Sequence, residues 1–135
     1  MKSRIWGSSI LCILLVALSI PTSSAVISES ANKRVVVMKL GSTTRIVMHS
    51  TFWQLKSIGG LSIERIGDPV VTPILPGPTA PDGCKVMGSG CGTFELRLKA
   101  IKVGVSSIQL ERSSCGEAMR CTQDESRFQV KVLVK

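Results

Sequence analysis

Hydrophobic and polar residues alternate along the second half of the chain. In residues 93–100 every second position, from Phe94 to Ala100, is apolar, and the positions between them are polar or charged. Residues 127–134 repeat this alternation and residues 106–112 follow it more weakly. Because successive side chains of a β-strand point to opposite faces of a sheet, the pattern predicts three strands with one buried and one exposed face.

The apolar positions of these strands predict a shared core. Its expected members are Phe94, Leu96, Leu98, Ile108, Leu110, Phe128, Val130 and Val132. Trp53 has two readings, a core anchor at the start of a strand or an exposed aromatic that grips a partner.

Shorter apolar segments precede this half of the chain. They are residues 34–40, 43–48, 52–55, 61–66 and 70–74. Glycines and Asp68-Pro69 separate them, which gives turn signals at intervals of about 8 to 12 residues. This spacing predicts an all-β sandwich or barrel rather than a helical domain.

Residues 1–25 have the composition of a secretory signal. Lys2 and Arg4 precede the apolar segment 10–20, and small residues lead to Ala25. The apolar segment is shorter than the ~20 residues that a membrane-spanning helix needs. We therefore predict cleavage after Ala25 and a secreted or secretory-lumen domain of residues 26–135, whose mature form does not span a membrane.

Four cysteines remain after such cleavage: Cys84, Cys91, Cys115 and Cys121. In an oxidising compartment an even number predicts two disulfides, and the spacing leaves local pairing and cross-pairing equally open. The spacings are longer than those of zinc knuckles, so no metal site is predicted. Cys84 and Cys91 lie in a loop rich in proline and glycine, residues 75–92, and the other two lie between the last strands.

Composition argues against catalysis. The 135 residues include one His and no Tyr, and no nucleotide-binding, zinc-peptidase or serine-hydrolase motif is present. We therefore predict no enzymatic activity and no cofactor. The net charge of +8 permits an anionic partner, but nucleic acid is not expected because the chain lacks a set of stacking aromatics.

Residues 88–104 and the strands that follow resemble the C-terminal half of the chagasin-type cysteine protease inhibitors. In that family a GxGG loop precedes a strand that ends in Ala, and a Gly turn then leads to a strand that runs into an Arg-Pro-aromatic loop. The residues that carry the resemblance are Gly88, Gly90, Gly92, Ala100, Gly104 and Arg112. The likeness extends over roughly residues 33–135.

Two loops of this sequence depart from the family pattern. The family loop that covers the catalytic cysteine carries Asn-Pro-Thr-Thr-Gly followed by an aromatic and a nearby Trp. Here Thr51, Phe52 and Trp53 are in keeping with it, whereas the Asn, Pro and Gly are absent. Ser113 and Ser114 occupy the places of the Pro and the aromatic that follow the family's arginine.

The resemblance implies an immunoglobulin-like antiparallel β-sandwich of about seven to eight strands. It also implies a monomeric thiol protease inhibitor that enters the cleft of a papain-like cysteine protease as a reversible three-loop wedge. The residues expected in those loops are His49, Ser50, Thr51, Phe52, Trp53, Gly88, Gly90, Gly92, Arg112, Ser113 and Ser114.

A second function is compatible with the same fold. A secreted immunoglobulin-like module could bind another extracellular protein or an anionic surface without inhibiting a protease. Its support is a set of basic residues expected on one face: Arg97, Lys99, Lys102, Arg112 and Lys131.

Overall fold

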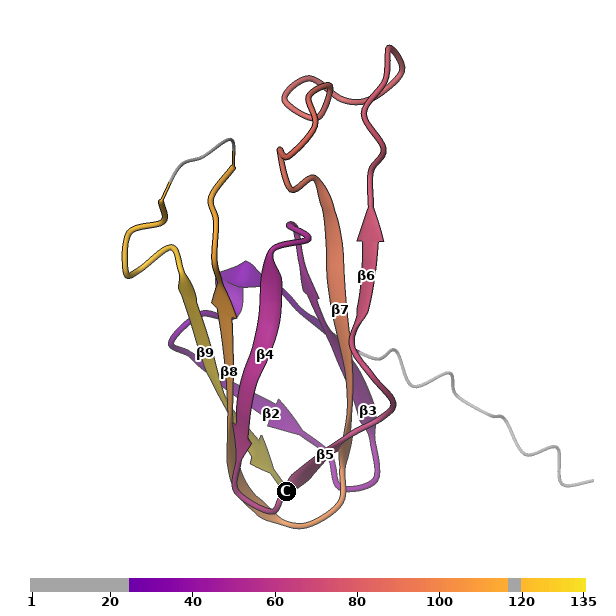
Figure 1. Cartoon of the computed structure of the whole chain (residues 1–135). Helices are drawn as coiled ribbons and strands as arrows, with labels where there is room; N and C mark the ends of the chain where they lie inside the picture. The colour runs from indigo at the N-terminus through magenta and orange to yellow at the C-terminus, as the bar shows by residue number, and fades with distance from the viewer. Residues whose placement is uncertain (1–24, 117–119) are drawn as a thin grey trace, which may run out of the picture.

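Two β-sheets pack face to face in the computed structural model, which describes residues 25–116 and 120–135 (Figure 1). Nine strands occur in this described part of the chain, together with one 3-10 turn, η1 (Glu29–Ala31). The strands are β1 (Val26–Ile27), β2 (Val35–Met38), β3 (Thr43–Met48), β4 (Trp53–Gly59), β5 (Ile63–Arg65), β6 (Val70–Pro73), β7 (Gly92–Ala100), β8 (Gly104–Arg112) and β9 (Arg127–Val134).

One sheet has the order β1-β3-β7-β5, with β6 also paired to β7, and the other has the order β2-β9-β8-β4. β5 and β6 pair with opposite halves of β7, so together they form one interrupted edge strand. Most pairs are antiparallel, but β1 pairs with β3 and β2 pairs with β9 in parallel. The β-sandwich is therefore confirmed, with both sheets mixed rather than purely antiparallel and with one more strand than the upper expectation.

The core lies between the two sheets and follows the predicted alternation. All eight side chains expected in the core are buried, none with more than 2% of its surface exposed. Trp53 is also buried, at 5% exposure, which favours its interpretation as a core anchor at the start of β4. Ile46 and Met48 of β3 are buried in the same core, and they belong to the sheet that faces Trp53. Burial on this scale is the main source of stability for a domain of this size.

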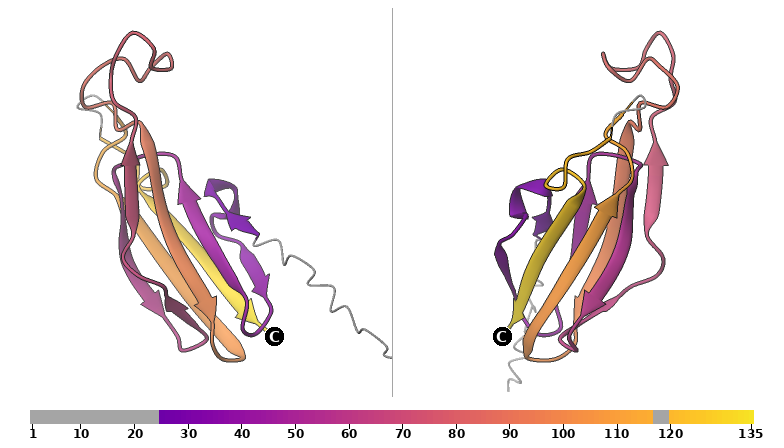
Figure 2. Two further views of the ribbon diagram at one scale, coloured as in Figure 1. Left: turned by 90° about the vertical axis from the view of Figure 1, so that its right-hand side faces the viewer. Right: turned by 60° about the vertical axis from the view of Figure 1, so that its left-hand side comes forward.

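The two ends of the sandwich differ (Figures 1 and 2). Tight turns of residues 39–42, 60–62 and 101–103 close one end, which we call the turn end. The other end, which we call the loop end, carries the longer connections of residues 49–52, 74–91 and 113–126. Residues 74–91 project furthest beyond the sheets in both figures.

The basic residues expected on one face do not share a face. Arg97 and Lys99 are exposed on β7 of one sheet, and Lys131 is exposed on β9 of the other. The expectation was wrong because it took each strand's exposed side without knowing that β7 and β9 belong to opposite layers. No helix in residues 25–116 or 120–135 is long and apolar enough to cross a membrane. Residues 1–24, which carry the predicted signal, lie outside the described residues.

Candidate functional site

The shortest connection at the loop end is a tight turn between β3 and β4. Ser50 is buried, and its hydroxyl Oγ accepts a hydrogen bond from the Phe52 backbone N–H at 3.2 Å. His49 precedes it with an exposed ring, and both its backbone N–H and its Nδ1 contact the carboxylate of Glu29 in η1. The Nδ1 to Oε2 distance is 3.0 Å. The turn is therefore held by a hydrogen bond to its own Ser50 and by the contacts of His49 with Glu29 in the N-terminal segment.

These contacts favour the ionised form of the Glu29 carboxylate. Partial burial raises its pKa, but hydrogen bonds from the backbone N–H of His49, from its own backbone N–H and from the His49 ring together outweigh burial and leave the pKa below its ordinary value. Glu29 thus supplies a negative charge beside the turn that carries the predicted site residues 49–53.

The longest connection, residues 74–91, is organised along its length. The Cys84–Cys91 disulfide closes its second half, with an S–S distance of 2.03 Å. The Ala80 N–H donates to the Gly77 carbonyl at 3.1 Å, and the Cys84 N–H donates to the Pro81 carbonyl at 2.9 Å. These turns follow from prolines and glycines that fix or free the backbone where the chain reverses.

A third backbone hydrogen bond closes the base of this loop. The Ile74 N–H donates to the Cys91 carbonyl at 3.0 Å, which continues the pairing of β6 with β7 by one step. The loop therefore emerges from a paired stem and ends in a disulfide-bonded segment.

Glycine at position 90 joins the short and long loops. The Thr51 N–H donates to the Gly90 carbonyl at 2.9 Å. The Phe52 ring lies against Gly90 so closely that a Cβ built there would be 2.0 Å from a ring carbon. Gly90 also has φ +70, in the left-handed region that favours glycine. Only glycine at position 90 permits this contact.

Gly92 permits a second close approach. A Cβ at this position would lie 2.3 Å from the Thr72 carbonyl oxygen and 2.7 Å from the Thr51 methyl group. Gly88, by contrast, has open space around it and adopts φ +83 as a turn residue. The three predicted glycines thus have two roles, packing at positions 90 and 92 and backbone conformation at position 88.

The third connection begins at Arg112, the last residue of β8. Its guanidinium lies 5.2 Å from the centre of the Trp53 ring, and its Nε donates to the Glu125 carbonyl at 2.8 Å. The Glu125 side chain accepts hydrogen bonds from the backbone N–H and hydroxyl of Thr122, which hold the pKa of that carboxyl below its usual range. Arg112 therefore has internal partners and braces residues 122–125.

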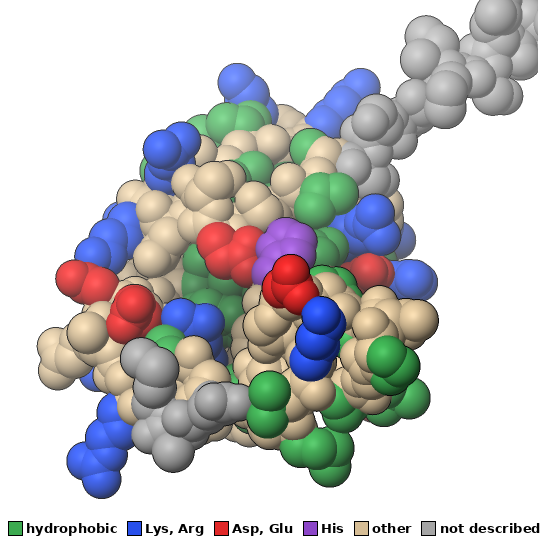
Figure 3. Space-filling view, turned by 90° about the horizontal axis from the view of Figure 1, so that it is seen from above, with side chains coloured by type: hydrophobic (Ala, Val, Ile, Leu, Met, Phe, Trp, Pro, Cys, Tyr) green, Lys and Arg blue, Asp and Glu red, His purple; other side chains and the backbone are tan. Residues whose placement is uncertain are grey.

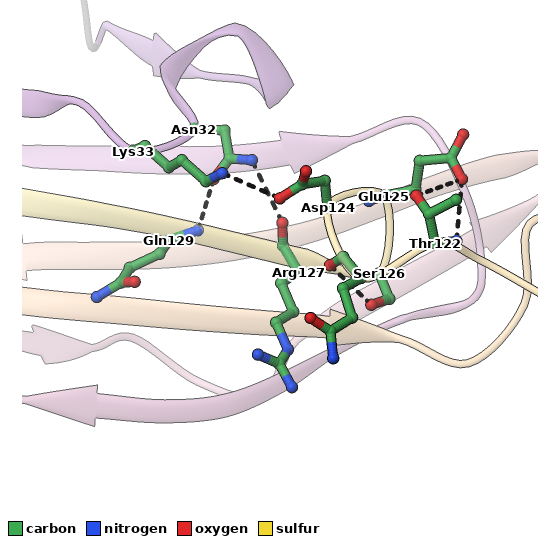
Figure 4. A network of polar contacts seen from close by, with 9 residues as sticks. Asn32, Lys33, Thr122, Asp124, Glu125, Ser126, Arg127 and Gln129 are labelled. Carbon is green, nitrogen blue, oxygen red and sulfur yellow. Dashed lines mark hydrogen bonds and ion pairs between the residues drawn. The ribbon is translucent and has the colours of Figure 1, made fainter.

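The base of the third connection is tied to the N-terminal segment (Figure 4). The Asn32 amide accepts from the Gln129 N–H at 2.9 Å and donates to the Arg127 carbonyl at 3.3 Å. Lys33 forms an ion pair with Asp124 at 3.1 Å. Both ends of the connection 113–126 are therefore held in place: Arg112 contacts Glu125 at its start, and Asn32 and Lys33 contact Arg127 and Asp124 at its end.

The second disulfide joins Cys115 to Cys121 within this connection. Both disulfides are therefore local, which resolves the two pairings that the spacing left open. A Cβ at Gly116 would lie 3.9 Å from the Ser89 carbonyl oxygen, so the second and third loops lie close together. Ser114 exchanges hydrogen bonds with Gly116, while Ser113 is exposed.

The loop end also exposes apolar side chains that the sequence analysis did not select. They belong to the long loop: Ile74 at 45%, Leu75 at 78%, Val86 at 53% and Met87 at 80% exposure. Figure 3, which looks onto this end, shows hydrophobic side chains gathered on one side of the surface. The only signal for them was their position inside a proline- and glycine-rich segment.

The structure places all eleven predicted site residues at the loop end. Residues 49–53, Gly90, Gly92 and Arg112 contact one another, whereas Gly88, Ser113 and Ser114 lie further along their loops. Sequence analysis missed Glu29 and Glu125, which support the first and third connections. Glu29 lies far in sequence from His49, and Glu125 accepts from Arg112 through its backbone carbonyl, which any residue possesses. No sequence motif therefore marks either residue.

No protein-family model and no curated protein sequence matches the chain. Among solved structures, the chain is similar to the solution structure of amebosin, with 15% identity, a TM-score of 0.53 and coverage of 82% of this chain and 96% of that chain. It is also similar to the crystal structure of the cysteine protease inhibitor EhICP2 from Entamoeba histolytica, with 14% identity, a TM-score of 0.56 and coverage of 82% and 94%. At such identities the similarity shows the fold alone: this chain folds like amebosin and like a solved cysteine protease inhibitor.

Proposed function

We propose that the chain is a secreted inhibitor of papain-like cysteine proteases and that the loop end enters the protease cleft as a reversible wedge. The observation that carries the proposal is the joining of three separate connections at one end, centred on the Thr51 to Gly90 hydrogen bond and the Phe52 contact. The similarity in fold to EhICP2 supports the choice of partner.

A wedge of this kind gains affinity from preorganisation. Loops that are already ordered lose little conformational entropy when they bind, so more of the contact energy appears as affinity. Here two disulfides, the Ile74 to Cys91 hydrogen bond and the Arg112 contacts restrict the loops before any partner arrives. Such inhibition needs no catalytic group and no cofactor.

The exposed apolar side chains give the wedge a chemical character. Leu75, Val86 and Met87 lie on the loop that projects furthest, where they can transfer from water into an apolar cleft. The Asp82 to Lys85 ion pair, at 2.7 Å, neutralises the two charges next to them. The tip of the long loop therefore suits a concave apolar surface better than a charged one.

Secretion is part of the proposal and rests on residues 1–25. Their basic start, apolar segment and small residues before Ala25 are typical of a cleaved signal. The two disulfides are also typical of an oxidising compartment.

Titration of the domain against papain, with residual activity as the readout, tests the proposal. We expect reversible, competitive inhibition that weakens at least about tenfold in Thr51→Asp, because the new charge would lie at a partly buried position between the short and long loops. Thr43→Asp, at the exposed first position of β3 and far from this turn, serves as the matched control and should inhibit like the wild type. Absence of inhibition by the wild type, or equal loss in both variants, would contradict the proposal.

A further inference from the structure

The turn end, opposite the three loops, carries a second surface with its own chemistry. Backbone hydrogen bonds join its turns: the Gly41 N–H donates to the Ala100 carbonyl at 2.8 Å, and the Ile101 N–H donates to the Ser62 carbonyl at 2.9 Å. The Ser62 N–H in turn donates to the Ser106 hydroxyl at 2.9 Å. Residues 39–42, 60–62 and 101–103 therefore form one continuous, ordered end (Figure 1).

Large apolar side chains occupy the exposed positions of this end. They are Leu40 at 48%, Leu61 at 75%, Ile101 at 46%, Val103 at 61% and Val105 at 57% exposure. Tight turns normally carry polar residues, glycine or proline at such positions. Four branched apolar side chains on neighbouring turns, with Val105 of β8 beside them, therefore indicate a binding surface.

Lysines flank the apolar side chains. Lys39 and Lys102 are exposed beside them. The sequence of residues 39–42, 60–62 and 101–103 contains no Asp or Glu. The first carboxylate beyond these turns along β5 is Glu64, and its register partner is another lysine, Lys99. The turn end is therefore apolar at its centre and basic around it.

We propose that the turn end binds the surface of an anionic phospholipid bilayer. The apolar turns would enter the headgroup region and the lysines would contact lipid phosphates and carboxylates, the combination by which peripheral proteins bind membranes. Charge decides between the possible occupants: a second copy of the chain would bring lysines against lysines, whereas an anionic bilayer complements them. The inference does not rest on the proposed function, because the loop end points away from this surface (Figure 1).

The domain from Val26 is the protein to test, because the apolar segment 10–20 would bind lipid by itself. The core side chains described above all lie between Ile27 and Val134, so this domain contains the whole of that core. Its cosedimentation is measured with vesicles of phosphatidylcholine and phosphatidylserine and with vesicles of phosphatidylcholine alone. We expect binding to the mixed vesicles only, and release as salt rises, because salt screens the lysines.

Two double variants locate the surface. Leu61→Ser with Val103→Ser should lower the partition coefficient about tenfold by removing apolar contacts, and Lys39→Glu with Lys102→Glu should lower it at least as much. The matched controls are Leu75→Ser with Met87→Ser, and Lys85→Glu, at the loop end. They should bind vesicles like the wild type. All four positions changed at the turn end, Leu61, Val103, Lys39 and Lys102, are exposed, so the thermal unfolding midpoint should not change.

A fluorescent reporter tests the geometry independently. In Leu61→Trp the new indole should shift its emission to shorter wavelength when mixed vesicles are added, whereas Leu75→Trp should not. Failure of the wild-type domain to bind mixed vesicles would overturn the proposal. So would loss of binding in the loop-end controls, or a dimer in sedimentation velocity that Leu61→Ser dissociates. Protease inhibition should be unchanged in the turn-end variants, which separates this test from that of the proposed function.

Discussion

The guanidinium of Arg112 lies 5.2 Å from the centre of the Trp53 ring and joins the last residue of β8 to the first residue of β4. The two residues are also register partners across the strand pair. Trp53 follows directly after the short loop and Arg112 directly precedes the third connection. One cation–π contact therefore couples the bases of two loops that are distant in sequence.

Replacement of Arg112 by alanine should therefore loosen the loop end. We expect a loss of about 1 to 2 kcal/mol in the free energy of unfolding, from the cation–π contact and the hydrogen bond to the Glu125 carbonyl. Guanidinium denaturation measures it. Lys131→Ala, an exposed position on β9, is the control and should change stability little. Equal stability of the Arg112 variant and the wild type would show that this contact contributes nothing.

Gly90→Ala and Gly88→Ala form a matched pair at the long loop. Both glycines have positive φ, so both variants carry similar backbone strain. Only the Gly90 variant places a methyl group against Phe52, because Gly88 has nothing within 4 Å. We expect the Gly90 variant to lose at least about tenfold in affinity for papain and the Gly88 variant to lose much less. Equal inhibition constants for the two would contradict the role assigned to the Phe52 contact.

The Glu29 to His49 contact predicts a pH dependence of stability. The pKa of Glu29 is lower in the folded chain than its ordinary value, so its ionised form stabilises the fold above that value, and the contribution is lost as the pH falls through the folded pKa. Glu29→Gln should therefore be less stable than the wild type at pH 7. The difference should shrink as the pH falls below about 4.3. Denaturation of both proteins across this range measures it, and equal stability of the two proteins at pH 7 would contradict the prediction.

Leu96 and Lys99 test the assignment of the two faces of β7. Leu96 is fully buried, and its replacement by alanine should cost about 2 to 5 kcal/mol through lost burial and the cavity that remains. Lys99→Ala should change the free energy of unfolding by less than about 0.5 kcal/mol, because its side chain is exposed. Coincident denaturation midpoints would mean that the inner and outer faces had been assigned wrongly.

The regular strands could be predicted from sequence because their burial alternates with period two. Residues 127–134 match β9, and the eight predicted core residues are all buried. β1 could not be predicted, since its two residues are too few to show an alternation. The parallel pairing of β2 with β9 could not be predicted from the sequence either, because the pairing of distant segments leaves no local sequence signal.

The candidate site could be predicted only in part. Glycine spacing and the cysteines located the long loop, but the pairing of the cysteines depends on which segments the fold brings together. The contact of Phe52 with Gly90 joins residues 38 positions apart and follows from packing rather than from any motif. Leu75 and Met87 escaped notice because an apolar residue in a loop is exposed or buried according to the tertiary structure alone.

The claim that the loop end is the protease-binding surface is tested most directly by hydrogen exchange of the domain, free and bound to papain whose active-site cysteine has been blocked by a small alkylating group. We predict slower exchange in the complex for residues 49–52, 74–91 and 113–116, and unchanged exchange for the turns of residues 39–42, 60–62 and 101–103. Protection at the turn end instead, or no protection at saturating papain, would contradict the account.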